Sequence, residues 1–77
     1  MKHICDGHEY TTQQDGGTIH ARNNYGTPVA ISELSPCMEY VIFTSFETGH
    51  SDAYHVNAIG DRYSVAQQLV RWYSVSE

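Results

Sequence analysis

The sequence predicts an α+β domain in which about four to six short antiparallel strands precede one C-terminal amphipathic helix that packs on one face of the sheet. Two observations carry this prediction. Turn signals recur every ~8–12 residues from the N-terminus onward, a spacing typical of β-rich chains. The last segment instead places its apolar residues at helical spacing. Because a chain of 77 residues suits one domain, residues 1–77 are taken as a single domain.

The N-terminal part contains three runs of strand-like composition separated by tight turns. Strands are expected over residues 2–5, 8–13 and 18–22. Turns are expected at Asp6-Gly7, Asp15-Gly16-Gly17 and Asn23–Gly26. Alternation along the strands places Tyr10 with Thr12, and Ile19 with Ala21, on common faces, and we expect these faces to be buried.

Residues 27–36 are expected to lie at the margin of the sheet. Residues 27–31 have strand-like composition, but Pro28 has no amide hydrogen to donate to a ladder. We therefore expect an edge strand there. Residues 32–36 are expected to form a loop or a single helical turn.

Residues 39–47 form the most strand-like run of the chain, because they are rich in β-branched and aromatic types. Alternation puts Val41 and Phe43 on one face, and the opposite face also carries large apolar groups. We therefore expect a central strand with the helix on one face and the other face at least partly covered. Residues 48–52 are expected to form a hairpin loop, and residues 53–59 a partner strand.

The C-terminal segment is predicted to form an amphipathic helix of about 10–12 residues. Its apolar stripe and the residues beside it are Val65, Leu69, Trp72, Ser76, Ala66, Val70 and Tyr73. Ser64 followed by Gln67 has the spacing of a capping box, and Asp61 is a competing cap one turn earlier. Trp72 is expected to dock on the strand over residues 39–47.

The formal net charge is −5, from nine acidic and four basic residues. Direct binding to nucleic acid is not expected, because neutralising phosphates needs clustered Lys and Arg. An anionic membrane surface is disfavoured for the same reason. The sequence has neither an apolar run of ~18 residues nor a signal-peptide-like N-terminus, so we expect a cytoplasmic location. Cys5 and Cys37 are too few for a disulfide scaffold, which agrees with a reducing compartment.

His3, Cys5 and His8 are three potential metal ligands within six residues. Cys37 would complete a Cys₂His₂ set if strand pairing brought it near them. The spacing lacks the close Cys pair of structural zinc sites, however, and solvated histidines explain the segment equally well. We therefore predict no metal and no cofactor. The His, Ser and Asp residues around the hairpin loop match no nucleophile motif, so enzyme activity is not expected.

The acidic and aromatic side chains are the best candidates for a protein-binding surface. Tyr25 lies in a predicted turn and Tyr54 on the predicted partner strand, and Tyr is enriched at interface hot spots. Glu47, Asp52 and Asp61 are the acidic candidates. Acids spread over a small rigid sheet can imitate the spacing of phosphates. We therefore expect a partner with a basic surface, such as a nucleic-acid-binding complex.

As a type, the chain resembles the small phage-encoded anti-CRISPR inhibitors. The resemblance covers the whole chain and rests on the charge of −5, the tight turn at Asp15-Gly16-Gly17, the strand over residues 39–47 and the helix over residues 64–73. It includes no shared motif, so no functional residue is carried over. The resemblance implies a non-enzymatic inhibitor, in the host cytoplasm, that binds a CRISPR-Cas defence complex and blocks DNA recognition or nuclease recruitment.

Two other classes stay open. The first is a small zinc-stabilised module, whose melting temperature would fall when a chelator removes the metal. The second is a viral structural or assembly protein that forms homodimers or larger homo-oligomers. An exposed edge strand near Pro28 or over Lys2–Cys5 would offer it a pairing surface.

Overall fold

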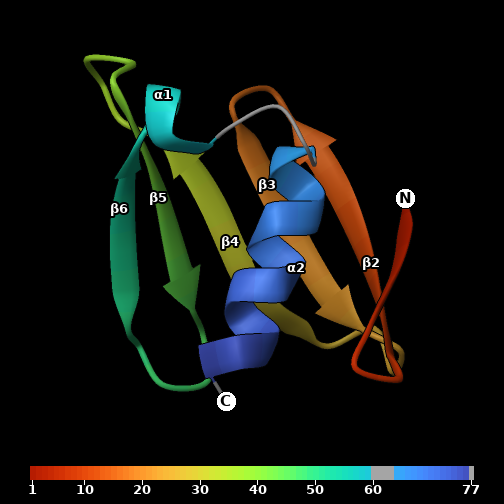
Figure 1. Cartoon of the computed structure of the whole chain (residues 1–77). Coiled ribbons are helices and arrows are strands. Elements are labelled where there is room, and N and C mark those ends of the chain that lie inside the picture. The colour runs from red at the N-terminus through yellow and green to blue at the C-terminus, as the bar shows by residue number, and fades with distance from the viewer. Residues whose placement is uncertain (60–63, 77) are drawn as a thin grey trace.

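The computed structural model describes residues 1–59 and 64–76, which form one antiparallel sheet and two helices. The strands are β1 (Lys2–Cys5), β2 (His8–Asp15), β3 (Thr18–Asn23), β4 (Pro28–Leu34), β5 (Tyr40–Ser45) and β6 (Ser51–His55). The helices are α1 (Val56–Ile59) and α2 (Val65–Ser76). Each strand pairs with the next one in the chain, so the six-stranded sheet is a simple meander with β1 and β6 at its edges (Figure 1).

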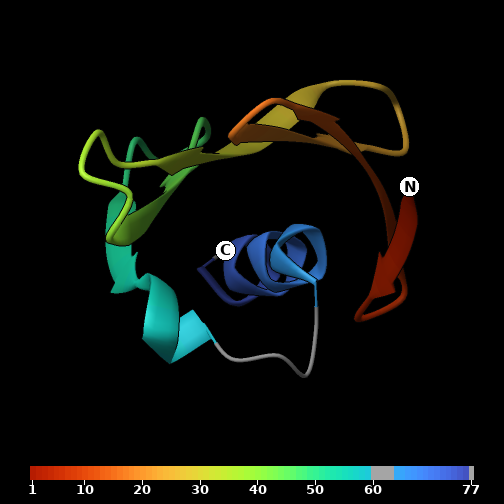
Figure 2. The ribbon, with the colours of Figure 1, turned by 90° about the horizontal axis from the view of Figure 1, so that it is seen from above.

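The sheet curls into an open arc, and α2 lies along its concave side (Figure 2). Strand twist makes such curling natural, and it lets one helix contact strands from both halves of the sheet. The predicted α+β fold with a C-terminal helix on one face is confirmed. In the described part of the chain, no helix is long and apolar enough to cross a bilayer.

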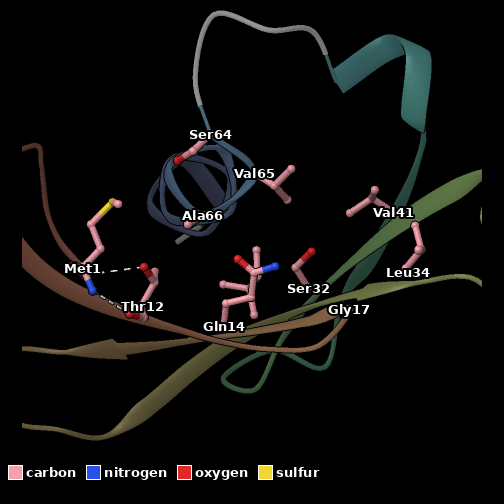
Figure 3. Close-up of a pocket in the computed structure, with 11 residues that line it drawn as sticks. Met1, Thr12, Gln14, Gly17, Ser32, Leu34, Val41, Ser64, Val65 and Ala66 are labelled. Atoms are coloured by element: carbon pink, nitrogen blue, oxygen red, sulfur yellow. Dashed lines mark hydrogen bonds between the residues drawn. The ribbon is translucent and has the colours of Figure 1, made fainter.

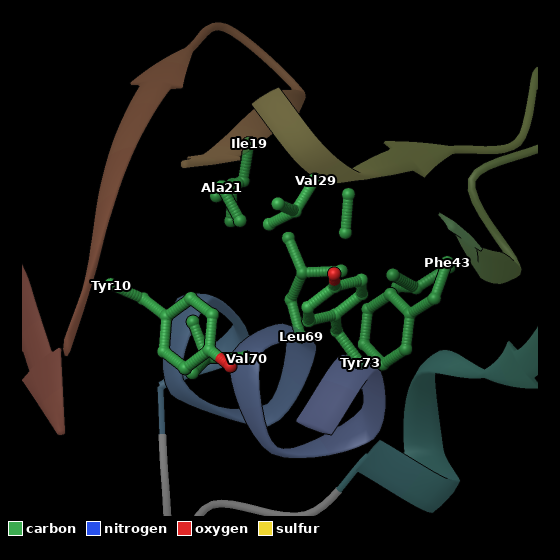
Figure 4. Close-up of a cluster of buried hydrophobic side chains, with 10 residues drawn as sticks. Tyr10, Ile19, Ala21, Val29, Phe43, Leu69, Val70 and Tyr73 are labelled. Carbon is green, nitrogen blue, oxygen red and sulfur yellow. The ribbon is translucent and has the colours of Figure 1, made fainter. Parts of the chain in front are cut away.

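The hydrophobic core fills the space between α2 and the concave face (Figure 4). Its buried members are Tyr10, Ile19, Ala21, Val29, Ala30, Val41, Phe43, Leu69, Val70 and Tyr73. Alternation along β2, β3 and β5 put the expected residues on this face, because side chains on a strand point to opposite faces in turn. The α2 residues in the core come from the stripe that helical spacing predicted, although Leu69, Val70 and Tyr73 are buried more deeply than Val65 and Trp72.

The turns and the helix start follow local chemistry. Asp6 and Gly7 have φ values of 52° and 78°, which a type I′ turn requires at both central positions. Ser64 accepts a hydrogen bond from the Gln67 amide on its Oγ at 3.2 Å, as expected for the N-cap of α2. The predicted competing cap, Asp61, lies outside the described residues.

The prediction of an edge strand at residues 27–31 is wrong, because β4 runs between β3 and β5. Pro28 is the first residue of β4, where a missing amide interrupts only the end of the ladder. A register shift beside it, between Ala21 and Arg22, allows the consecutive residues Val29 and Ala30 both to be buried. The loop expected at residues 32–36 is also wrong in part, because β4 continues to Leu34, which pairs with Val41 of β5.

β5 is an interior strand with α2 on one face, as predicted. Its outer face carries no second layer in the described part of the chain. There Tyr40 is 42% exposed, and Phe46, just beyond the strand, is 52% exposed. The partial cover expected on that face is limited to Ile42 and Thr44, whose side chains are half-buried.

The partner strand expected over residues 53–59 is shorter and begins earlier, since β6 spans Ser51–His55. β5 begins at Tyr40, which pairs with His55, so residues after His55 have no strand beside them. The Asn57 amide donates to Nδ1 of His55 at 3.2 Å, and the chain turns into α1 there. The side-chain nitrogen acts as a cap for this short helix.

Candidate functional site: an acidic collar and an aromatic cleft

Three consecutive residues near the end of α2 each donate a side-chain hydrogen bond to a carboxylate of the sheet region. The bonds are Trp72 Nε1 to Asp52 Oδ2 at 2.7 Å, Tyr73 OH to Glu47 Oε2 at 2.7 Å and Ser74 Oγ to Asp6 Oδ2 at 3.2 Å. Successive helix residues are about 100° apart, so the three bonds point to different sides of α2. We call Asp6, Glu47 and Asp52 the acidic collar.

The meander explains why these acids meet at one end of α2. Asp6 belongs to the β1–β2 turn, Glu47 to the β5–β6 turn, and Asp52 to the start of β6. In a meander, alternate turns lie at the same end of the sheet, and the C-terminus of α2 lies at that end too (Figure 1). Residues up to 68 positions apart in the chain therefore share one surface.

The collar places three carboxylates at this end of the molecule. A helix C-terminus carries a partial negative charge, which cations stabilise and anions do not. The last turn of α2 holds no basic residue, and three carboxylates stand around it. The hydroxyl and indole donors orient the carboxylates and bring no positive charge of their own. A cationic group from outside the chain would meet a field built from both sources.

His50 lies beside the collar and contacts two of its neighbours. Its Nε2 is 3.2 Å from Asp52 Oδ2, and its ring stacks on Trp72 at a centroid distance of 6.3 Å. Protonation of His50 would convert the first contact into an ion pair. Both side chains are well exposed, so such a pair contributes little to stability.

Next to the collar, aromatic rings line a cleft of about 570 Å³ between α2 and the β6–α1 segment. The Trp72 and Phe43 centroids are 5.6 Å apart, which confirms that Trp72 docks on the strand expected over residues 39–47. Tyr54 extends the series at 5.5 Å from Phe43 and is 37% exposed. Asp52 and Arg71 also line the cleft, so it joins an aromatic wall to charged groups.

The structure brings together three of the five predicted binding residues. Glu47, Asp52 and Tyr54 lie around the C-terminal half of α2. Tyr25 is 85% exposed in the β3–β4 turn and lines a separate shallow hollow of about 170 Å³ that Tyr73 also borders. Asp61 lies outside the described residues.

Asp6 and the donors on α2 were not predicted as site residues. Trp72 and Tyr73 were treated as core residues alone, yet a partly buried indole N–H or phenol O–H generally needs a hydrogen-bond partner. The sequence therefore already indicated that Trp72 and Tyr73 would lie near hydrogen-bond acceptors. It does not identify Glu47 or Asp52 as those acceptors, because the pairing depends on the fold.

The possible zinc set of His3, Cys5, His8 and Cys37 is not brought together. Cys37 lies in the β4–β5 turn, whereas Cys5 ends β1, and two strands separate β1 from β4 in the sheet. Within the described residues, no group of three or more His, Cys, Asp or Glu side chains is placed to hold a metal ion. His3 instead hydrogen-bonds Thr12 Oγ1 through Nε2 at 2.9 Å, and burial lowers its pKa.

The fold and this surface define a class: a small α+β domain whose sheet wraps one helix, with an acidic, aromatic face at one end. Compared with known protein families, with curated proteins and with solved structures, the chain shows no significant match.

Proposed function

We propose that the chain is a non-enzymatic binding protein whose acidic collar and adjoining aromatic cleft dock on a basic surface of a partner protein. The observation that carries the proposal is the set of three carboxylates, each held by a hydrogen bond from α2, around a helix C-terminus. These side chains are ordered before the partner arrives, so binding loses little of their rotamer freedom.

The contacts leave room for a cation. A carboxylate offers about four lone-pair sites. At Asp6 the α2 bond uses one of them, and at Asp52 the α2 bond and the contact with His50 use two. An arginine guanidinium suits the remaining positions, because it presents paired donors to carboxylate oxygens. Trp72 and Tyr54 lie in the cleft beside Asp52, and aromatic faces attract the same cation. The surface therefore favours an Arg-rich partner over a neutral one.

In its finer form, the proposal is that the protein is a phage or mobile-element inhibitor acting in the bacterial cytoplasm. Its partner would be a CRISPR-Cas defence complex, whose basic nucleic-acid channel matches an acidic ligand. Occupying that channel would block DNA recognition or nuclease recruitment with no bond made or broken. The net charge of −5 and the general resemblance to anti-CRISPR inhibitors support this form.

A matched pair of charge variants tests the proposal. The collar variant carries Asp6→Asn, Glu47→Gln and Asp52→Asn, whose amide oxygens can still accept the bonds from α2. The control carries Asp15→Asn, Glu33→Gln and Glu39→Gln, which are exposed at the opposite end of the sheet. Both change the net charge equally. Binding to purified CRISPR effector complexes and phage plating on CRISPR-active bacteria are the measurements.

We expect the collar variant to lose affinity by roughly tenfold or more, and the control by much less, since paired charges act at short range. Wild-type affinity should also fall as salt is added. Equal losses in both variants would mean that net charge alone matters. Tight binding that neither the variants nor salt weaken would refute a role for the collar. If no effector binds but another basic protein does so through the collar, only the finer form fails.

The edges of the sheet favour a second candidate, a structural or assembly protein that pairs with copies of itself. β1 is an edge strand, and Ile4 on it is 73% exposed, although Pro28 is not at an edge. An unpaired edge can form a ladder with another chain. Light scattering that gives a monomer mass at high protein concentration would exclude this candidate.

A further inference from the structure

A cavity of about 420 Å³ lies between the first turn of α2 and the concave face of the sheet (Figure 3). Ile19, Val41 and Val65 supply apolar wall, while Gln14 and Ser64, both exposed, stand at its rim. Among the described residues that line it, none carries a charged side chain. The cavity shares no lining residue with the aromatic cleft, so it is a separate feature.

Ser32 on β4 is the unusual residue of this cavity. The residue is only 2% exposed, and its hydroxyl points from the strand towards α2 (Figure 3). This hydroxyl makes no hydrogen bond to any other described residue. The Ser32 oxygen is not completely enclosed by protein, because every fully buried side-chain N or O atom in the described part has a hydrogen-bond partner. The Ser32 hydroxyl is therefore a hydrogen-bonding group open only to the cavity.

The other deeply buried hydroxyls near the concave face are satisfied by the protein. Thr12 also lines the cavity, but its Oγ1 bonds the His3 ring at 2.9 Å. Ser45, which is as buried as Ser32, accepts the Thr48 amide on its Oγ at 3.4 Å. A buried hydroxyl without a partner is costly, so proteins usually pair such groups. Ser32 is the exception, and its position indicates a partner from outside the chain.

The size of the cavity limits what that partner can be. A dry void this large would cost more than a small domain can bear, so water or a ligand fills it. At about 30 Å³ per water, its volume equals that of roughly 14 waters. An organic molecule with on the order of 10–15 non-hydrogen atoms fits the same space, and the volume falls within the usual range of ligand pockets.

We propose that this cavity binds a small, uncharged and largely apolar molecule that carries one hydroxyl or carbonyl oxygen, which hydrogen-bonds Ser32. The described residues of the lining offer no charged side chain, and the N-terminal ammonium of Met1 already donates a hydrogen bond to the Thr12 carbonyl oxygen at 2.8 Å. An ionic ligand would find little to pair with there, and a buried ion needs a paired charge. An apolar wall with one buried hydroxyl that the described residues leave without a partner is the usual composition of a small-molecule pocket. This site goes beyond the binding function proposed above and does not depend on it.

4-Phenylbutan-1-ol is a suitable probe, and its binding to the full chain can be followed by two-dimensional ¹H–¹⁵N NMR. We expect saturable shifts at the amides of Thr12, Ser32 and Val65, and small shifts around the acidic collar. Ser32→Ala should weaken binding by about two- to tenfold, the effect of one neutral hydrogen bond. Ser45→Ala is the matched control, because it removes an equally buried hydroxyl outside the cavity and should leave the affinity unchanged.

Ala66→Leu is a second variant that fills the cavity from α2 and should weaken binding about tenfold or more. If this variant does not fold, the comparison of Ser32→Ala with Ser45→Ala still shows whether the Ser32 hydroxyl contributes to binding of the probe. An absence of saturable shifts up to the solubility limit of the probe would mean that only water occupies the cavity, and the proposal would be wrong. It would be equally wrong if both serine variants weakened binding to the same extent, or if a folded Ala66→Leu variant bound the probe as tightly as the wild type.

Discussion

At its C-terminal end α2 is tied to the sheet by three side-chain hydrogen bonds to carboxylates, whereas its N-terminal end stands over a cavity with an unpaired hydroxyl. Both ends belong to one helix of 12 residues on one sheet. The difference shows that packing along a single helix need not be uniform even in a very small domain. One end is held by directional bonds, and the other leaves space.

Side-chain size explains the contrast. Near the N-terminal end, Ala66 faces small residues of the sheet such as Gly17 and Ser32, and small residues on both sides leave a gap. Near the C-terminal end, Trp72 packs against Phe43, and large rings fill the space between helix and strand. The large rings also bring polar N–H and O–H groups, which reach acceptors at the rim of the sheet.

Removing the Trp72 side chain should have the largest effect on the C-terminal end. Trp72→Ala deletes the ring contact with Phe43 and the bond to Asp52, and we expect a loss of about 3 kcal/mol, because the indole is only partly buried. Urea denaturation measures this loss. Trp72→Phe keeps a ring in place and should lose distinctly less. An unchanged midpoint for Trp72→Ala would refute the docking.

Tyr73→Phe tests the hydrogen bonds of the collar alone. The ring stays in the core against Tyr10, at a centroid distance of 5.9 Å, while the bond to Glu47 is lost. We expect a loss of about 1–2 kcal/mol, since a bond to a charged but exposed group is of this size. Tyr25→Phe is the matched control, because Tyr25 is 85% exposed and should change stability very little. Equal melting temperatures for both variants would show that the collar bonds do not hold α2.

The smallest effect is expected at the other end of α2, where His3 bonds Thr12 beside the cavity. Burial lowers the pKa of His3 in the folded state, and the N-terminal ammonium adds to the effect. The unfolded chain then binds the proton more readily, so stability is complete above the unfolded pKa of 6.5 and falls as pH drops through the folded pKa. Thermal melts between neutral and mildly acidic pH measure the fall.

His3→Gln should flatten this part of the stability profile. His8→Gln is the control, because His8 is exposed and should leave the profile as in the wild type. Carboxylates also titrate as the pH falls, so the comparison of the two variants isolates the histidine. If the wild type and His3→Gln lose the same stability as the pH falls, burial of His3 is not the cause of the loss at acidic pH.

Much of the fold could be predicted because its causes are local. Glycine at positive φ sets the tight turns, alternation sets the buried faces of β2 and β3, and Ser64 caps a helix whose apolar stripe has helical spacing. The misplaced elements fail for one shared reason. The extent of β4 and the end of β6 depend on which strand lies beside them, and composition does not specify a neighbour.

The candidate site was less predictable than the fold. The acids and aromatics that compose it were visible in the sequence, and Glu47, Asp52 and Tyr54 were named from type alone. The bond from Ser74 to Asp6 joins residues 68 positions apart, and a local sequence pattern cannot predict a contact between residues so far apart in the chain. The spare hydroxyl of Ser32 was equally hidden, because a strand serine faces solvent or a cavity according to the layer above it.

By itself, the sequence determined the class of fold, the main helix and the negative charge, because periodicity, turn chemistry and composition act over a few residues at a time. The tertiary structure alone decided that the acids gather around the C-terminus of α2 and that a cavity opens at its N-terminus. Both features arise where the curled sheet brings distant segments against one helix, and that meeting depends on strand order and on the sizes of facing side chains.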